Sequence, residues 1–262
     1  LFMRYWEENG LRIGIKNEEE MAHMRESGRI LGIILAEIEQ MIAPGITGLD
    51  IDAKAVSIME KFNVKASFKG YQGFPNVACI NINNQVVHGI PTDRVLQEGD
   101  IITVDCGVVY KGFHSDSAIS VGVGNISPEA QKLISTAEKA LKKGIETAKA
   151  GIRVGKISEI IEKTIVKNGF SVVHDLIGHG IGTELHEDPP VPNFKDSDPG
   201  PLLQPGMTIA IEPIITAGRP EITLEKDNWT YITSDGSLAT QVEHTIAITE
   251  KGVEILTKRP TL

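Results

Sequence analysis

Positive charge, cysteine and long apolar runs are what this 262-residue sequence has little of. The net charge is −9, whereas binding a phosphate backbone needs a concentrated positive face, so nucleic acid is not expected as the main partner. Two cysteines, Cys79 and Cys106, give no disulfide framework and suit a reducing compartment. No segment approaches membrane-spanning length, and the first residues show no apolar run of signal-peptide length. These absences predict a cytoplasmic protein with no membrane partner.

Linkers, charge blocks and low-complexity stretches are also missing. The composition, 41% hydrophobic and 23% charged, is typical of a soluble globular protein, and the length suits one large core or two fused half-domains. We therefore expect a single domain over residues 1–262, with 1–14 as an N-terminal extension. Leu1 and Phe2 precede a methionine and are candidates for a processing or cloning remnant.

Two carboxylates are predicted to share one face of a β-hairpin. Residues 101–121 read as a mostly buried strand, a turn and a returning strand. If Lys111-Gly112 is a two-residue loop, Asp105 and Asp116 are diagonal neighbours with Cβ atoms up to roughly 7–8 Å apart. That separation leaves room for cations, whereas an odd-length loop would send the acids to opposite faces. The same alternation directs Cys106 into the core.

Two further acids lie in a repeat of this pattern. Residues 96–105 align with 203–212 at an offset of 107, with four of ten positions identical, and both segments end on an acid. Glu212 thus corresponds to the first acid of the hairpin, and Glu243 opens a strand similar to the one after the second. Chance similarity between short apolar strands is the alternative. We interpret the repeat as two related halves that each supply two carboxylates.

Each half is predicted to begin with a pair of helices. Asn17 before three glutamates and Ser127-Pro128 are signals for helix starts, and Gly169 is a signal for a helix end. The predicted helices cover about 17–42, 47–62, 127–150 and 156–168. The expected fold is α+β, with halves of about 17–125 and 126–250. In each, helices pack on one side of a curved, mostly antiparallel sheet and acids project from the other.

A histidine lies between the acid-bearing strands of the two halves. Three glycines surround His179, which rule out a stable helix and let the backbone approach whatever the imidazole contacts. A lone histidine would be read as an ordinary polar residue, but the repeated acids favour a ligand. Four carboxylates and one imidazole favour Mn²⁺, Fe²⁺, Co²⁺ or Zn²⁺ in a paired site.

Paired cations of this kind indicate hydrolysis. Two ions about 3.5–4 Å apart can share a water, lower its pKa and hold the oxygen of the electrophile. A carboxylate at the edge of the site can take the proton of that water and return it to the leaving group.

Six segments, taken in order, resemble the motifs of type I methionine aminopeptidases. The match runs from about Ile15 to Leu256 and is highly specific because all six motifs occur in sequence. The segments are 84–91 (NQVVHGIP), 104–107 (VDCG), 112–116 (GFHSD), 178–182 (GHGIG), 205–213 (PGMTIAIEP) and 243–245 (EHT). The resemblance implies the pita-bread fold and removal of the initiator methionine from nascent polypeptides. It also implies a monomer, with the ribosome as a candidate partner.

The resemblance also implies roles for individual residues. The five metal ligands of the family fall on Asp105, Asp116, His179, Glu212 and Glu243. Two divalent ions are expected, with Asp105 and Glu243 bidentate or bridging and His179 on the second metal; their identity among Co, Mn, Fe and Zn stays open. Glu212 matches the residue that shuttles the proton of the water. His88 and His186 match histidines that orient the substrate amide and stabilise the tetrahedral intermediate.

The methionine pocket is implied in the same way. Tyr71, Phe74, Cys79 and Trp229 match residues that line an apolar, sulfur-tolerant pocket. Without the resemblance, Phe74 and Trp229 would be read as core. Leu185 departs from the pattern, because bacterial relatives often carry an aromatic residue there, so the shape of the pocket does not follow from the resemblance.

Four other interpretations fit the sequence less well. Proline-specific peptidases of this fold usually carry a large extra N-terminal domain, for which the few residues before Asn17 leave no room. Type II methionine aminopeptidases carry a helical insertion, for which the spacing of His179, Glu212 and Glu243 leaves no space. A non-catalytic pita-bread binding protein would have lost ligands, and this sequence keeps all five. A metal phosphoesterase would need more histidines and cationic phosphate contacts near the site.

Overall fold

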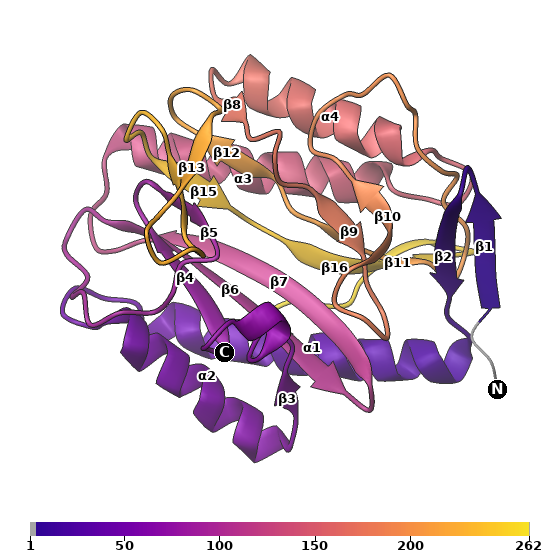
Figure 1. Cartoon of the computed structure of the whole chain (residues 1–262), viewed down its shortest axis with the longest axis horizontal. Helices are drawn as coiled ribbons and strands as arrows, with labels where there is room; N and C mark the ends of the chain where they lie inside the picture. The colour runs from indigo at the N-terminus through magenta and orange to yellow at the C-terminus, as the bar shows by residue number, and fades with distance from the viewer. Residues whose placement is uncertain (1–3, 262) are drawn as a thin grey trace.

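The computed structural model describes residues 4–261, and the candidate processing remnant at Leu1 and Phe2 lies outside them. Helices and antiparallel strands are interspersed along the chain, as expected for an α+β protein (Figure 1). The helices are α1 (Glu18–Met41), α2 (Gly48–Phe62), α3 (Pro128–Thr147), α4 (Val154–Lys167) and the short 3-10 helix η1 (Tyr71–Gly73).

The strands divide at about the middle of the chain. The first set is β1 (Arg4–Glu8), β2 (Leu11–Ile15), β3 (Lys65–Ala66), β4 (Ala78–Ile82), β5 (Gln85–Val87), β6 (Ile101–Tyr110) and β7 (Phe113–Gly122). The second set is β8 (Ser171–Val172), β9 (Gly178–Gly180), β10 (Glu187–Val191), β11 (Thr208–Ile211), β12 (Ile214–Thr216), β13 (Ile222–Leu224), β14 (Tyr231–Thr233), β15 (Ala239–Gln241), β16 (His244–Thr249) and β17 (Gly252–Ile255). Every strand pair formed by these elements within residues 4–261 is antiparallel.

The helix starts follow the predicted capping signals. Asn17 and Thr47 each form a capping box at the start of α1 and α2, and the Ser127 hydroxyl accepts a bond from the Ala130 N–H ahead of α3. These bonds satisfy backbone donors that have no partner inside the helix. Two predicted boundaries were off by a few residues. Helix α3 ends at Thr147 because the next residue turns into the core, and α4 starts two residues earlier than expected.

The β6–β7 hairpin has the predicted register. Lys111 and Gly112 form the two-residue loop, with φ of 48° and 83°, which suits a hairpin turn that needs φ above zero at both positions. Asp105 lies opposite Ala118, and Asp116 lies opposite Gly107. The two acids therefore share one face as diagonal neighbours, whereas Cys106 is fully buried on the other face, as expected.

The second acid pair is built differently. Strand β11 pairs with β16, with Ile211 opposite His244. Glu212 therefore directly follows one strand and Glu243 directly precedes its partner. Between them the chain makes a long excursion through β12 to β15 instead of a two-residue turn. The repeat thus extends to the strand that ends on each first acid, while the connection to the second acid differs.

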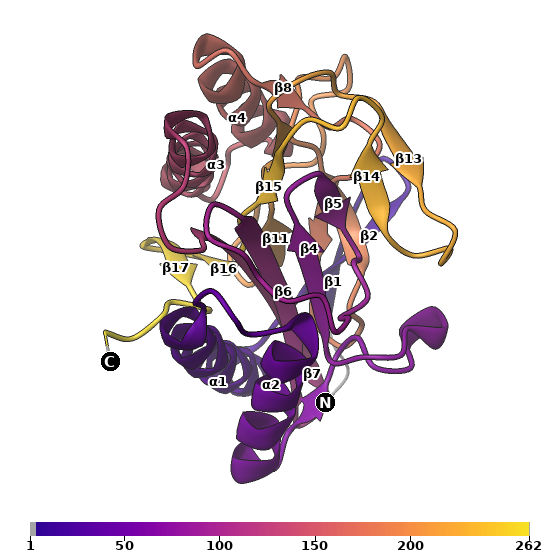
Figure 2. The same cartoon turned by 90° about the vertical axis from the view of Figure 1, so that its left-hand side faces the viewer.

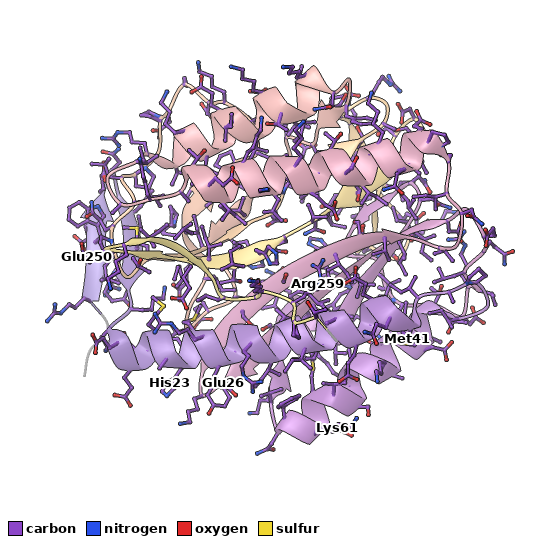
Figure 3. All side chains as sticks on the ribbon, turned by 180° about the vertical axis from the view of Figure 1, so that it is seen from behind. His23, Glu26, Met41, Lys61, Glu250 and Arg259 are labelled. Carbon is purple, nitrogen blue, oxygen red and sulfur yellow. The ribbon has the colours of Figure 1, made fainter. Side chains whose placement is uncertain are left out.

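Helices cover one side of the strands in both halves. Figures 2 and 3 show α1 with α2 and α3 with α4 as two pairs on the same side of the strands. One apolar cluster joins α1 and α2 to β4, β6 and β7, and another joins α3 and α4 to β11 and β16. The halves meet along β7, where Ser117 Oγ donates to Glu243 O over 2.6 Å and Glu243 N donates to Ala118 O over 3.0 Å.

The N-terminal hairpin β1–β2 was not predicted. Residues expected only as an extension form two paired strands. Glu8 attaches the hairpin to the second half by accepting bonds from Arg153 Nη1 at 3.0 Å and from Leu202 N at 3.1 Å. Among residues 4–261, no helix combines the length and apolar character needed to cross a membrane.

The C-terminal segment, residues 256–259, lies directly on helix α1. A Cβ placed on Gly28 would lie 2.5 Å from Leu256 O and 2.7 Å from its carbonyl carbon. Only glycine therefore lets the backbone of the segment approach α1 so closely. Arg259 Nε donates to Glu39 Oε2 over 3.1 Å further along the same helix.

We predict that Gly28→Ala lowers the free energy of unfolding by about 1–3 kcal/mol, the usual effect of overpacking. In an open helix position the same change would instead stabilise by roughly 1 kcal/mol. Gly144→Ala in α3 is the matched control, because its Cβ would meet side-chain carbons of Ile161 and not backbone. Denaturant titration of both variants checks the prediction, and a Gly28→Ala protein as stable as the wild type would contradict it.

Candidate metal centre and adjoining pocket

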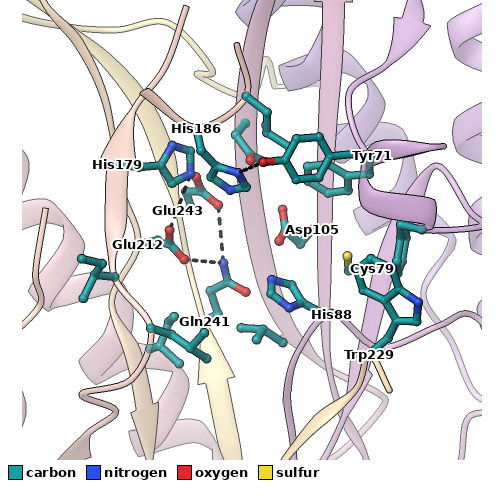
Figure 4. Close-up of a pocket in the computed structure, with 18 of the residues that line it drawn as sticks. Tyr71, Cys79, His88, Asp105, His179, His186, Glu212, Trp229, Gln241 and Glu243 are labelled. Carbon is teal, nitrogen blue, oxygen red and sulfur yellow. Dashed lines mark hydrogen bonds and ion pairs between the residues drawn. The ribbon is translucent and has the colours of Figure 1, made fainter. Parts of the chain in front are cut away.

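All the predicted site residues line one cavity of about 220 Å³. They come from both halves of the chain and from well-separated strands and loops (Figure 4). The predicted residues in the lining are Tyr71, Phe74, Cys79, His88, Asp105, Asp116, His179, His186, Glu212, Trp229 and Glu243. The fold thus brings together positions that span most of the sequence.

Three of the predicted ligands form a compact group. Single ligand atoms from Asp116, His179 and Glu243 lie within 4.8 Å of one another. Glu212 adjoins this group, with its Oε1 atom 3.8 Å from His179 Nε2. Asp105 is buried on the same face of the β6–β7 hairpin as Asp116. The set offers oxygen and imidazole nitrogen donors, which suit first-row divalent metals.

The ring orientation of His179 favours metal ligation. Its Nδ1 atom lies 2.8 Å from Gly180 O, a carbonyl that can only accept, so Nδ1 carries the proton. The lone pair of a neutral ring is then on Nε2, the atom that faces Glu212. Burial, reinforced by the nearby His186, lowers the pKa of His179 to about 3 and keeps the ring neutral. A neutral ring with a fixed tautomer is the ligand form of histidine.

Placing four ionised carboxylates in this buried site is energetically unfavourable unless a cation balances their charge. Burial raises the pKa of Asp105 and Asp116, and in Asp116 the charge of Asp105 adds to the effect. Burial likewise raises the pKa of Glu212 and Glu243, with further contributions from the neighbouring acids. Among the described lining residues, none is lysine or arginine. Protein groups therefore supply no positive charge to balance four acids.

Unsatisfied oxygens support the same conclusion. Asp105 Oδ1, Asp116 Oδ1 and Glu243 Oε1 are buried and have no hydrogen-bond partner. A buried acceptor without a partner costs about 1–3 kcal/mol, and more when it is charged. Divalent cations would satisfy all three oxygens at once, so the residues fit the metal ions that the sequence predicts.

Sequence reasoning missed Gln241, which lies among the acids. Its Nε2 atom is 3.1 Å from Glu212 Oε2 and 3.4 Å from Glu243 Oε2, so the amide donates to either carboxylate. Figure 4 shows it between these two side chains. The spacing of two residues between Gln241 and Glu243 carried a signal, because side chains two apart in an extended segment share a face.

Two histidines outside the acid cluster face the cavity. His186 lies against His179, with ring centroids 4.3 Å apart, and its Nδ1 atom is 2.7 Å from the Tyr71 hydroxyl. His88 adopts φ of 58°, an unusual conformation for a residue other than glycine. Burial lowers the pKa of His88, to about 4, and also that of His186. Both rings are therefore neutral near pH 7 and can donate from one nitrogen.

The other end of the cavity is apolar. Phe74 and Trp229 meet edge to face with ring centroids 5.1 Å apart, and the buried thiol of Cys79 lies beside Trp229 in Figure 4. Leu185 is buried in the same apolar cluster. Further lining residues that sequence reasoning did not single out are Phe68, Val87, Leu176, Ile177 and Ile214. These side chains are also ordinary core residues in type, so the sequence alone gave no signal for them.

Comparison with known proteins gives consistent matches. The model of metallopeptidase family M24 matches residues 22–250. A methionine aminopeptidase of Clostridium perfringens is 47% identical over 243 residues, covering 93% of this chain and 98% of that protein. The crystal structure of a methionine aminopeptidase from Thermotoga maritima superposes with a TM-score of 0.92 at 41% identity, covering 94% of this chain and 100% of the other. For that from Rickettsia prowazekii the TM-score is 0.91 at 35% identity, with coverage of 94% and 99%.

We predict that Asp116→Asn stabilises the metal-free protein at pH 8 by about 1–3 kcal/mol, the size of the repulsion between close carboxylates at an effective dielectric constant near 20. Added Mn²⁺ should raise the melting temperature of the wild type but not of the variant. Asp52→Asn is the control of opposite sign, because Asp52 accepts bonds from the N–H groups of Val77 and Ala78. Calorimetry with chelator and with metal checks the prediction, and a destabilised metal-free Asp116→Asn protein would refute it.

Proposed function

Because the chain belongs to metallopeptidase family M24, we propose that it is a metal-dependent methionine aminopeptidase. It removes the N-terminal methionine from polypeptides by hydrolysing the first peptide bond. One observation carries this proposal: a buried cluster of acids and histidine adjoins an apolar pocket within a single cavity. The chain is also similar over nearly its whole length to methionine aminopeptidases.

The fold class is the predicted one. The similarity to solved methionine aminopeptidases over 94% of the chain confirms the pita-bread fold. The description of residues 1–262 as a single catalytic domain with internal halves at about 17–125 and 126–250 stays a prediction. It is supported by the bonds between β7 and the strand that follows Glu243.

We further propose two divalent ions, of Co, Mn, Fe or Zn, held by Asp105, Asp116, His179, Glu212 and Glu243. Asp105 and Glu243 would each offer carboxylate oxygens to the ions, and His179 would offer Nε2, the nitrogen that faces Glu212. When bound, such ions lower the pKa of water and polarise the carbonyl of the scissile bond. The unpartnered oxygens of three of these acids support the assignment.

Glu212 is the proposed proton carrier. Its carboxylate takes a proton from the attacking water and passes it to the amine of the leaving peptide. Gln241 Nε2 donates to Glu212 Oε2, while Oε1 lies on the side of His179. We propose that one oxygen would serve as the metal ligand while the other carries the proton. The different surroundings of the two oxygens support this division.

His88 and His186 are the proposed substrate donors. Both rings are neutral near pH 7, so each has one N–H to offer. The Tyr71 hydroxyl lies 2.7 Å from Nδ1 of His186. We propose that the hydroxyl is the donor, which places the proton of the neutral ring on Nε2. An N–H donated to the carbonyl oxygen of the first residue strengthens as negative charge develops there, which lowers the barrier. His88 orients the amide in the same way.

The apolar end of the cavity is the proposed methionine pocket. Phe74, Cys79, Tyr71 and Trp229 supply aromatic and sulfur contacts that suit a flexible thioether. Leu185 lines the same cavity and is buried in its apolar cluster, so we propose that it contributes to the shape of the pocket. A small residue after the methionine is the proposed preference.

The biological setting is proposed on the same basis. The protein acts as a monomer in the cytoplasm, and nascent chains at the ribosome are the source of its substrate. The net charge of −9 agrees with peptides, and not nucleic acid, as the main partner.

Release of free methionine from Met-Ala-Ser and Met-Pro peptides tests the function. After chelation we expect no release, and addition of Mn²⁺, Fe²⁺, Co²⁺ or Zn²⁺ should restore it. Leu-Ala-Ser is the control for specificity, with a rate expected to be at least about tenfold lower, because a missing pocket contact costs 1–3 kcal/mol. No release under any metal would favour a non-catalytic binding protein, and faster cleavage of Leu-Ala-Ser would favour another aminopeptidase of the fold.

Glu212 and His186 should differ when each is replaced. Glu212→Ala removes the proton carrier and a ligand, so turnover should be abolished and metal content should fall. His186→Ala should lower kcat roughly 10²–10³-fold, as loss of one oxyanion donor does, and leave metal content unchanged. Elemental analysis beside peptide kinetics measures both effects. Loss of metal from His186→Ala would show that the assignment is wrong.

A further inference from the structure

Lys16 is a buried charged residue that the proposed mechanism does not use. It lies between β2 and α1, with only 1% of its side chain exposed. Its Nζ atom is 2.9 Å from Glu187 Oε2, and its backbone N–H donates to Gly206 O over 2.9 Å. Burial lowers the pKa of Lys16, while the charge of Glu187 opposes that effect. The pair is therefore largely removed from solvent.

Glu187 opens strand β10 immediately after His186. In the β9–β10 hairpin Glu187 lies opposite Gly180, so the two strands bring His179 and His186 to the same end of the hairpin. The loop between them, residues 181–186, carries His186 as its last residue. Whatever holds Glu187 thus fixes the point from which the His186 side chain projects.

Both carboxylate oxygens of Glu187 are used. While Oε2 accepts from Lys16, Oε1 accepts from the Thr183 hydroxyl at 3.2 Å and from Glu184 N at 3.1 Å. Gly182 lies directly on the pair, because a Cβ there would be 2.6 Å from Lys16 Nζ and 2.7 Å from Glu187 Oε1. The loop is therefore folded over the ion pair.

The contact on the opposite side of His186 comes from the first half of the chain. The Tyr71 hydroxyl reaches Nδ1 from η1, as Figure 4 shows. With the hydroxyl as donor, this bond keeps the ring proton on Nε2, and displacing the backbone that Glu187 holds would move the ring away from the hydroxyl. Two independent restraints on one imidazole are what preorganised donation requires.

We propose that Lys16 is a positioning residue for the hydrolysis, which orients the His186 imidazole through Glu187. The inference rests on the proposed function, in which His186 donates to the substrate. Lys16 itself belongs neither to the cavity lining nor to the acid cluster. A buried ion pair adds little stability compared with well-packed apolar residues, but removing one partner leaves an uncompensated charge. We therefore assign to the Lys16–Glu187 pair the role of fixing the conformation of the loop at residues 181–186.

Lys16→Met and Glu187→Gln are the test variants. The first keeps the length of the side chain without its charge, and the second keeps an oxygen for Thr183 and Glu184 without the ion pair. In each we expect kcat on Met-Ala-Ser to fall roughly 10–100-fold, the range for a residue that orients a functional side chain. KM should change less than about twofold and metal content should be unchanged, because the ligands are untouched.

A double-mutant cycle separates positioning from general damage. In the His186→Ala background, Lys16→Met should cause no further loss of kcat, because the group it orients is gone. Additive losses would overturn the inference. If His186→Ala alone keeps full kcat, the proposed role of His186 fails instead, so the two failures are distinguishable.

The tautomer of His186 gives a readout that needs no turnover. In the chelated wild-type protein, the ¹⁵N imidazole signals of His186, assigned by their absence from His186→Ala, should show one neutral form with the proton on Nε2. Lys16→Met and Glu187→Gln should shift these signals toward an average of two forms. Unchanged signals in both variants would overturn the inference.

Asn17→Ala is the matched control at the same point of the chain. It removes the side-chain cap of α1, which lies beside Lys16 but does not reach Glu187. The melting temperature should fall by a few degrees while kcat and the His186 signals stay at wild-type values. If Lys16→Met fails to fold, Glu187→Gln alone decides the question by the same measurements.

Discussion

Mutual repulsion among four buried carboxylates is the constraint on which the rest of this structure depends. Removing each charge from water costs several kcal/mol, and close like charges add to that cost. Apolar packing on the opposite face of the same strands offsets this cost. Asp105 faces the cavity, while Cys106, next in sequence, packs with the helices of the first half. Helix packing behind the strands therefore holds in place a front face that would otherwise open.

Polar groups of the second half support acids from both halves. Gln241 donates to the two glutamates, and Thr245 Oγ1 accepts from Asp116 N over 2.9 Å. These bonds hold two carboxylates and the backbone of a third acid without neutralising any charge. The charge balance is left to metal ions, and the proposed role of the adjoining apolar pocket is to select the peptide that reaches them.

Sequence reasoning reached the features that local rules determine. Capping at Asn17, the two-residue turn at Lys111-Gly112 and strand alternation around Asp105 depend on neighbouring residues, so they were predictable and match the structure. The N-terminal hairpin was missed because its strands are short and largely exposed, which leaves weak alternation. The pairing of Lys16 with Glu187 joins residues far apart in sequence, and nothing in either local pattern indicates it. For the site, the acids were accessible through their repeat, whereas the pocket and the two outer histidines depended on family resemblance.

The contact between Leu256 and Gly28 sets the order in which this protein can mature during its synthesis. Helix α1 is made first, yet the segment that packs on it is made last. Strands β16 and β17 lead from Glu243, the last acid of the proposed metal site, to that segment, so the strands beside this acid are completed only when the C-terminal residues are available. Long-range closure of this kind is slow compared with helix formation. The packing that surrounds the proposed metal site is therefore completed late, after the helices of the first half can form.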